Sequence, residues 1–99
     1  MKKIIIIGSG GLAIETYSFL KKCFGQKIKK KILGFISSDK PKIIIDGKKI
    51  LGNDEFLLKN FSNINLIIAI GNIKTRKKIF DSLKNKKYFW PNIHLQKFN

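Results

Sequence analysis

Residues 3–13 of this chain read KIIIIGSGGLA. The β-branched run from Ile4 to Ile7 is typical of a strand buried on both faces of a sheet. The glycines that follow end the strand, and the apolar periodicity from Gly11 to about Phe24 predicts a helix. The inward face of that helix is expected to carry Ala13, Tyr17, Leu20 and Phe24. A glycine-rich turn between a buried strand and a helix is typical of folds that bind phosphate groups at a helix start.

The rest of the chain alternates between apolar strand-like segments and helical segments. Further strands are expected at residues 32–36, 64–70 and 88–93. Residues 43–51 are expected to form either a tight hairpin or a strand with a turn at Asp46-Gly47. A short helix opens at Gly52-Asn53-Asp54, and another runs from Asn72 to about Lys86. Their expected inward residues are Phe56, Leu57, Phe61, Ile79, Phe80 and Leu83. Because Pro91 removes a backbone donor, the last strand is expected at an edge.

This alternation predicts an α/β fold, a small Rossmann-like domain with a mainly parallel sheet and helices on both faces. Two apolar strands end in glycine, at Gly8 and Gly71. Since the carboxyl ends of parallel strands share one edge, both turns are expected there, where open α/β sheets bind ligands. Asn72 is expected either to cap the third helix or to contact the ligand. Arg76 is either a solvated helix residue or an anion contact.

The glycine turn itself offers the strongest candidate contacts. The spacing fits Gly8-x-x-Gly11-x-Ala13 and also Gly8-x-Gly10-x-x-Ala13. A dinucleotide site would add an acidic residue at the end of the second strand, to hold the ribose hydroxyls. Asp39 follows that strand one or two residues late and equally fits a turn residue. The sequence therefore gives only weak support to an NAD-type site.

The net charge, and the residue types that occur only once in the sequence, argue against several other functions. The net charge is +15, from 21 basic and 6 acidic residues, and Arg76 is the only arginine. Specific nucleic-acid recognition favours arginine, so we expect DNA or RNA binding to be weak. One cysteine, Cys23, excludes an internal disulfide and a cysteine zinc site. The lone His94 has no evident catalytic partners, so neither catalytic residues nor a metal site are assigned.

The N-terminal apolar run is too short for a signal peptide or a membrane span, and a cytoplasmic protein without a membrane partner is expected.

Several segments together resemble a known family, the N-terminal domains of bacterial sugar O/N-acyltransferases, typified by sialic-acid O-acetyltransferases and amino-sugar acetyltransferases. The similar segments are 3–15, 33–36, 50–54, 68–72, 76–79 and 91–94. The resemblance implies that residues 1–99 form one nucleotide-sugar-binding domain, with a UDP-sugar as ligand, that serves surface glycan synthesis. The implied contacts are Gly8, Ser9, Gly10, Gly11, Leu12, Ser37, Asn72 and Arg76. Leu12 stands where relatives often carry His or an aromatic residue, and Ser37 where many carry Asp.

In that family a left-handed β-helix domain follows, which binds acetyl-CoA, forms the trimer and carries the general-base histidine. The resemblance implies that this second domain is missing here and that His94 does not match the base. The 99 residues alone are therefore expected to bind without catalysing, to hold no cofactor and to be monomeric. An NAD-type dinucleotide-binding module and a basic nucleic-acid-binding protein remain as alternatives. The sugar, the nucleotide base and the acyl group stay open.

Overall fold

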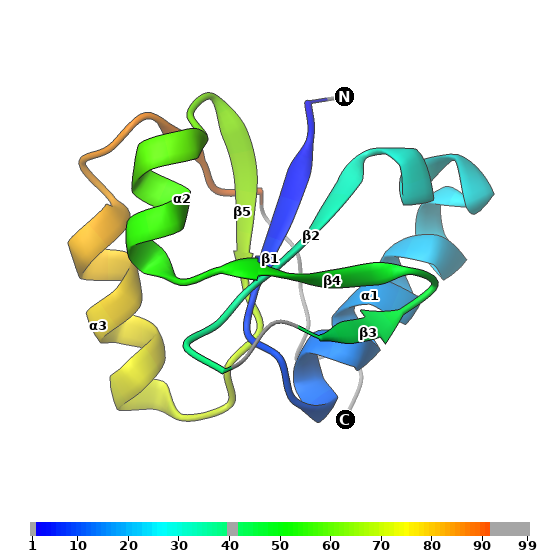
Figure 1. The fold of residues 1–99 in the computed structure, drawn as a ribbon, viewed down its shortest axis with the longest axis horizontal. Coiled ribbons are helices and arrows are strands. Elements are labelled where there is room, and N and C mark those ends of the chain that lie inside the picture. The colour runs from blue at the N-terminus through cyan, green and yellow to red at the C-terminus, as the bar shows by residue number, and fades with distance from the viewer. Residues whose placement is uncertain (1, 40–41, 92–99) are drawn as a thin grey trace.

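The computed structural model describes residues 2–39 and 42–91 of the 99-residue chain. Its strands are β1 (Ile4–Ile7), β2 (Ile32–Ile36), β3 (Ile43–Ile45), β4 (Lys48–Gly52), β5 (Ile64–Ile68) and β6 (Tyr88–Phe89). Its helices are α1 (Gly11–Phe24), α2 (Asp54–Asn60), α3 (Ile73–Leu83) and the short 3-10 helix η1 (Gln26–Lys30). The strands form a sheet in the order β3-β4-β2-β1-β5-β6 (Figure 1). Every neighbouring pair is parallel except β3 and β4.

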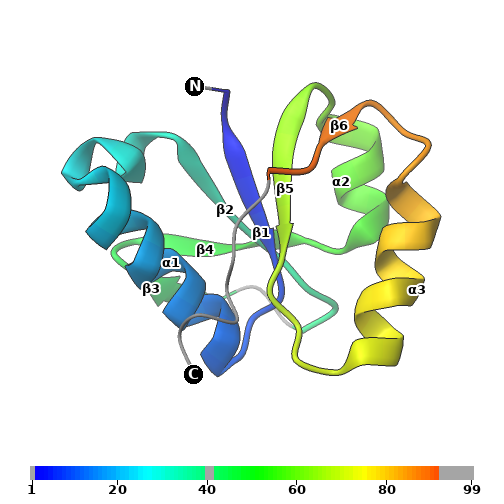
Figure 2. The same cartoon turned by 180° about the vertical axis from the view of Figure 1, so that it is seen from behind.

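The sheet is covered on both faces, with α1 on one side and α2 and α3 on the other (Figures 1 and 2). Successive side chains of a strand point to opposite faces, so the isoleucines of β1 divide between two cores. Ile4 and Ile6 join the cluster beneath α1, and Ile5 and Ile7 join the cluster beneath α2 and α3. All four are buried. The predicted Rossmann-like fold, with a mainly parallel sheet, is thereby confirmed.

The predicted hairpin is also present. Asp46 and Gly47 join β3 to β4 with φ of 52° and 76°, the two positive values that a type I′ turn requires. After this turn β4 pairs in parallel with β2. The two strands approach closely at Gly34, where an added Cβ would lie 2.7 Å from the carbonyl oxygen of Lys49.

Three aromatic residues that were expected inside are exposed instead. Phe24, Phe56 and Phe80 keep 51%, 37% and 40% of their surface. In α2 and α3 the inward positions are filled by Leu57 and Leu83, which are buried. Phe24 is the last residue of α1, one turn beyond its last buried residue, Leu20. Apolar periodicity alone did not reveal which apolar residues of each helix face the sheet.

Several element bounds also differ from the prediction. The 3-10 helix η1 was not among the expected elements, and it buries Ile28. Helix α3 ends at Leu83, and β6 covers only Tyr88–Phe89 at the edge of the sheet beside β5. Pro91 follows that strand, and residues 92–93 lie outside the described part. None of the helices in the described residues is both long and apolar enough to cross a membrane.

Candidate ligand site at the carboxyl ends of the strands

The two glycine turns lie side by side, as predicted. Strands β1 and β5 are neighbours, and the backbone N–H of Ala69 donates to the carbonyl oxygen of Ile7 at 2.8 Å. Gly8 has φ +132°, and a Cβ at this position would stand 2.5 Å from the carbonyl oxygen of Ala69. Contact of this kind leaves no room for a side chain. Gly8 therefore allows the turn after β1 to pass close to the turn after β5.

Three helices start at this edge of the sheet, and their N-termini are satisfied differently. In α2 the Asn53 side chain accepts a hydrogen bond from the N–H of Phe56 at 3.1 Å. In α3 the Asn72 side chain accepts from the N–H of Thr75 at 2.9 Å. The N-cap of α1 is Gly10, which has no side chain and makes no such bond. The first N–H groups of α1 are thus left for another acceptor.

Open space lies next to this uncapped helix start. A Cβ at Gly10 or at Gly11 would meet no heavy atom within 4 Å, and the same holds for Gly71. A Cβ at Gly11 would therefore not strain the turn, although the tight turn suggested that it would. What a side chain there would remove is free volume beside the helix start. Glycines with free space and no positive φ leave room for the close approach of a ligand.

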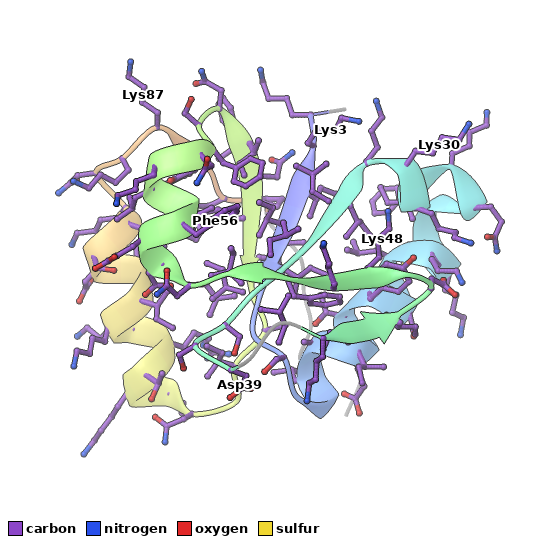
Figure 3. The ribbon with its side chains drawn as sticks, viewed as in Figure 1. Lys3, Lys30, Asp39, Lys48, Phe56 and Lys87 are labelled. Carbon is purple, nitrogen blue, oxygen red and sulfur yellow. The ribbon has the colours of Figure 1, made fainter. Side chains whose placement is uncertain are left out.

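A cluster of two hydroxyls and a carboxylate links this turn to the end of β2. The Ser9 hydroxyl donates to Asp39 Oδ2 at 2.5 Å and lies 3.0 Å from the Ser37 hydroxyl. The N–H of Asp39 donates to Ser37 Oγ at 3.2 Å. Hydrogen bonds from Ser9 and then Ser37 hold the pKa of the Asp39 carboxyl below its usual range. Asp39 therefore does more than occupy a turn, because it places an acceptor carboxylate beside the glycine turn (Figure 3).

A cleft of about 340 Å³ opens on the α2 and α3 side of the same edge. Its lining residues are Ile7, Gly8, Ile36, Ser37, Ser38, Asn53, Asp54, Glu55, Ile70, Thr75 and Ile79. Only Gly8 and Ser37 of these were predicted as contacts. Asn53, Asp54 and Glu55 were missed, although one signal could have revealed them. They follow β4, and a parallel position for that strand brings its carboxyl end to this edge.

Three other residues predicted as ligand contacts, Leu12, Asn72 and Arg76, do not line this cleft. Leu12 packs against the core beneath α1, which leaves its side chain little freedom to meet a ligand. Asn72 uses its side-chain oxygen for the cap of α3, and Arg76 is exposed one turn further along. His94 lies outside the described residues. Across residues 2–39 and 42–91, no three His, Cys, Asp or Glu side chains gather in a group that could hold a metal ion.

Comparison with known proteins agrees with this architecture. The model of the PglD N-terminal domain family matches residues 3–83. A solved structure with a similar fold is a mutant of perosamine N-acetyltransferase from Caulobacter crescentus in complex with CoA and GDP-perosamine, at 22% sequence identity and a TM-score of 0.69. The match covers 89% of this chain but only 40% of that protein. Among curated proteins no sequence matches significantly.

Proposed function

This chain belongs to the family of the PglD N-terminal domain, and on that premise we propose that it binds a nucleotide-activated sugar at the edge where its parallel strands end. The observation that carries the proposal is the uncapped start of α1, with open space over Gly10 and Gly11. A diphosphate there would accept hydrogen bonds from backbone N–H groups at the positive end of the helix dipole. The family match confirms the resemblance to N-terminal domains of bacterial sugar acetyltransferases.

The neighbouring cleft supplies a place for the rest of the ligand. Its volume of about 340 Å³ is at the lower end of the range for small-molecule sites. Isoleucines provide apolar surface, while the Ser37 hydroxyl and the carboxylates of Asp54 and Glu55 offer polar partners. Gly8 belongs both to this cleft and to the turn that leads to α1. We expect a UDP-sugar, and the GDP-perosamine held by the similar structure makes a GDP-sugar the first alternative.

We assign this domain to substrate recognition within a sugar acetyltransferase that acts in glycan synthesis, with acetyl-CoA bound elsewhere. Acyl transfer needs a positioned general base near a bound donor. The sequence has one histidine, His94, which lies outside the described residues. The 99 residues alone should therefore show no acetyl transfer from acetyl-CoA to an amino-sugar nucleotide. Turnover by this chain in a coupled thiol-release assay would contradict the assignment.

One observation favours a second candidate, an NAD-type site. The Asp39 carboxylate lies within hydrogen-bond distance of Ser9 in the glycine turn. A carboxylate after the second strand is what a dinucleotide site uses to hold ribose hydroxyls. The same carboxylate would also suit the ribose of a nucleotide-sugar, so Asp39 does not separate the two ligands. A direct binding measurement does.

Calorimetric titration of the chain with UDP-sugars, GDP-sugars and NAD separates the candidates. We expect a nucleotide-sugar to bind and Gly11→Val to abolish binding, because the new side chain fills the space beside the helix start. Gly71→Val is the matched control, since its space is equally open but adjoins the capped helix α3. It should retain most of the affinity, and Asn72→Ala should weaken binding less than Gly11→Val. Binding of NAD alone would favour the dinucleotide site, and no binding would leave the turn with a structural role only.

A further inference from the structure

The opposite edge of the sheet carries a row of lysines that the nucleotide site does not use. Strands β2, β1, β5 and β6 are neighbours and run in the same direction, so their amino ends share one edge. Pairs of lysines stand directly before three of these four strands. We call this set the amino-end rim, and its members are Lys2, Lys3, Lys30, Lys31, Lys86 and Lys87. Lys3, Lys30 and Lys87 are seen along this edge in Figure 3, with Asp39 at the opposite edge.

Backbone hydrogen bonds hold these lysine pairs in register across the sheet. The N–H of Ile4 donates to the carbonyl oxygen of Lys31 at 2.8 Å, and the N–H of Asn65 donates to that of Lys3 at 2.8 Å. The N–H of Asn63 donates to the carbonyl oxygen of Lys87 at 2.7 Å. Since neighbouring strands lie about 4.8 Å apart, the row from β2 to β6 spans roughly 15 Å. The fold thus gathers lysines that are distant in the sequence.

The charge of this rim is not neutralised within the described residues. The ion pairs found there join Lys21 and Lys29 to Asp46 and Lys84 to Asp81, and none involves the rim. Asp39, Asp54 and Glu55 belong to the carboxyl-end edge, and Glu15 lies in α1 after β1. Lysine side chains gathered without counter-charges repel one another, and an anionic surface relieves that repulsion.

Exposed aromatic side chains accompany the lysines. Phe89, in β6, keeps 42% of its surface, and the Lys2 ammonium lies 5.0 Å from the centre of its ring. Phe24 ends α1, keeps 51% of its surface and precedes η1, which leads to the amino end of β2. Exposed apolar groups beside lysines are typical of proteins that lie on a lipid surface. Arginine is the residue type that nucleic-acid recognition favours. The one arginine of the sequence, Arg76, belongs to the first turns of α3, which begins at the carboxyl-end edge and not at the rim.

We propose that the amino-end rim docks this domain peripherally on a membrane surface rich in anionic phospholipids. Lysines contribute to such binding as point charges near lipid headgroups, without base-reading geometry. The candidate nucleotide site lies at the far edge of the sheet, so it stays accessible to a ligand from solution. The expectation of no membrane partner was based on the lack of a spanning segment, which does not bear on surface docking.

The test compares two triple variants of equal charge in sedimentation with vesicles. The rim variant replaces three exposed lysines of the rim by Glu: Lys2, Lys3 and Lys87. The control variant replaces three exposed lysines elsewhere by Glu: Lys49, Lys74 and Lys77. Both changes lower the net charge of +15 by six. At physiological salt, wild type should bind phosphatidylcholine vesicles that contain phosphatidylglycerol, and not those of phosphatidylcholine alone. The rim variant should lose binding by about tenfold or more, whereas the control should stay within about twofold of wild type.

Several results would overturn the proposal. Equal losses in the two variants would mean that net charge alone drives binding. Failure of wild type to sediment with anionic vesicles would remove the docking surface altogether. Tighter binding to duplex DNA than to vesicles, lost with the same three lysines, would assign the rim to nucleic acid. Circular dichroism of both variants checks the fold, and nucleotide-sugar titration should be unchanged in the rim variant, so this test is independent of the proposed site.

Discussion

The turn after β1 and the turn after β5 look alike in sequence but differ in what their glycines do. Each follows a buried apolar strand and precedes a helix at the same edge of the sheet. Gly8 is required by geometry, since it has a positive φ and its missing side chain lets the Ala69 carbonyl pass. Gly71 has open space, and Asn72 beside it caps α3. The turn after β1 alone leaves its helix uncapped, which is why it is the better candidate for a phosphate.

Adding one methyl group should destabilise the fold strongly at Gly8 and hardly at all at Gly71. Gly8→Ala should lower the free energy of unfolding by roughly 3 kcal/mol or more, because of the positive φ and the contact with a backbone carbonyl. Gly71→Ala should stay within about 0.5 kcal/mol of wild type. Urea unfolding followed by circular dichroism measures both. Similar losses in the two variants would show that the turns are structurally equivalent.

The cap of α3 should have an intermediate effect. Asn72→Ala removes the acceptor for the N–H of Thr75 and should lower the free energy of unfolding by about 1 kcal/mol. Asn53→Ala, which removes the corresponding cap of α2, is the comparison and should lose a similar amount. An Asn72→Ala variant of unchanged stability with strongly reduced ligand affinity would give Asn72 a binding role instead.

Supplying a cap to α1 should change the stability less than Asn72→Ala does, and should change ligand binding more. Gly10→Ser places a hydroxyl at an N-cap with extended backbone and open space, and should raise the free energy of unfolding by about 0.3 kcal/mol. The same hydroxyl would compete with a ligand phosphate for the N–H groups of α1. Thermal unfolding and nucleotide-sugar titration of one preparation measure both changes. Tighter ligand binding by this variant would contradict the phosphate position.

The smallest effect concerns the carboxylate beside the first turn. Ser9→Ala removes the main hydrogen bond that lowers the pKa of Asp39, so this pKa should rise toward its ordinary value. A lowered carboxyl pKa stabilises the fold at neutral pH, and that contribution is lost as the pH falls through the folded-state pKa. The variant should therefore lose slightly less stability in acid than wild type. Carboxyl chemical shifts followed between neutral and acidic pH would report an unchanged pKa if Ser9 were not the cause.

The strand, the turn and the helix of residues 3–24 could be predicted from the sequence, because their signals are local. A β-branched run, a glycine break and a helical period each depend only on neighbouring residues. The hairpin at Asp46-Gly47 was predictable for the same reason, since positive φ at both positions is a property of the turn itself. The adjacency of the two glycine turns followed once parallel pairing was assumed.

Three further features depend on contacts in the folded structure: which glycines are sterically required, which helix starts are capped and which charges gather. Gly8 differs from Gly11 in its positive φ and in the nearby carbonyl of Ala69, which is more than 50 residues away in the chain. The contact of Ser9 with Asp39 and the cleft beside Asn53 depend on how β2 and β4 lie next to β1. The exposure of Phe56 and Phe80 depends on which side of α2 and α3 faces the sheet, where Leu57 and Leu83 are buried instead. Such contacts join distant segments, so no local pattern encodes them, and strand order has to be known before they can be placed.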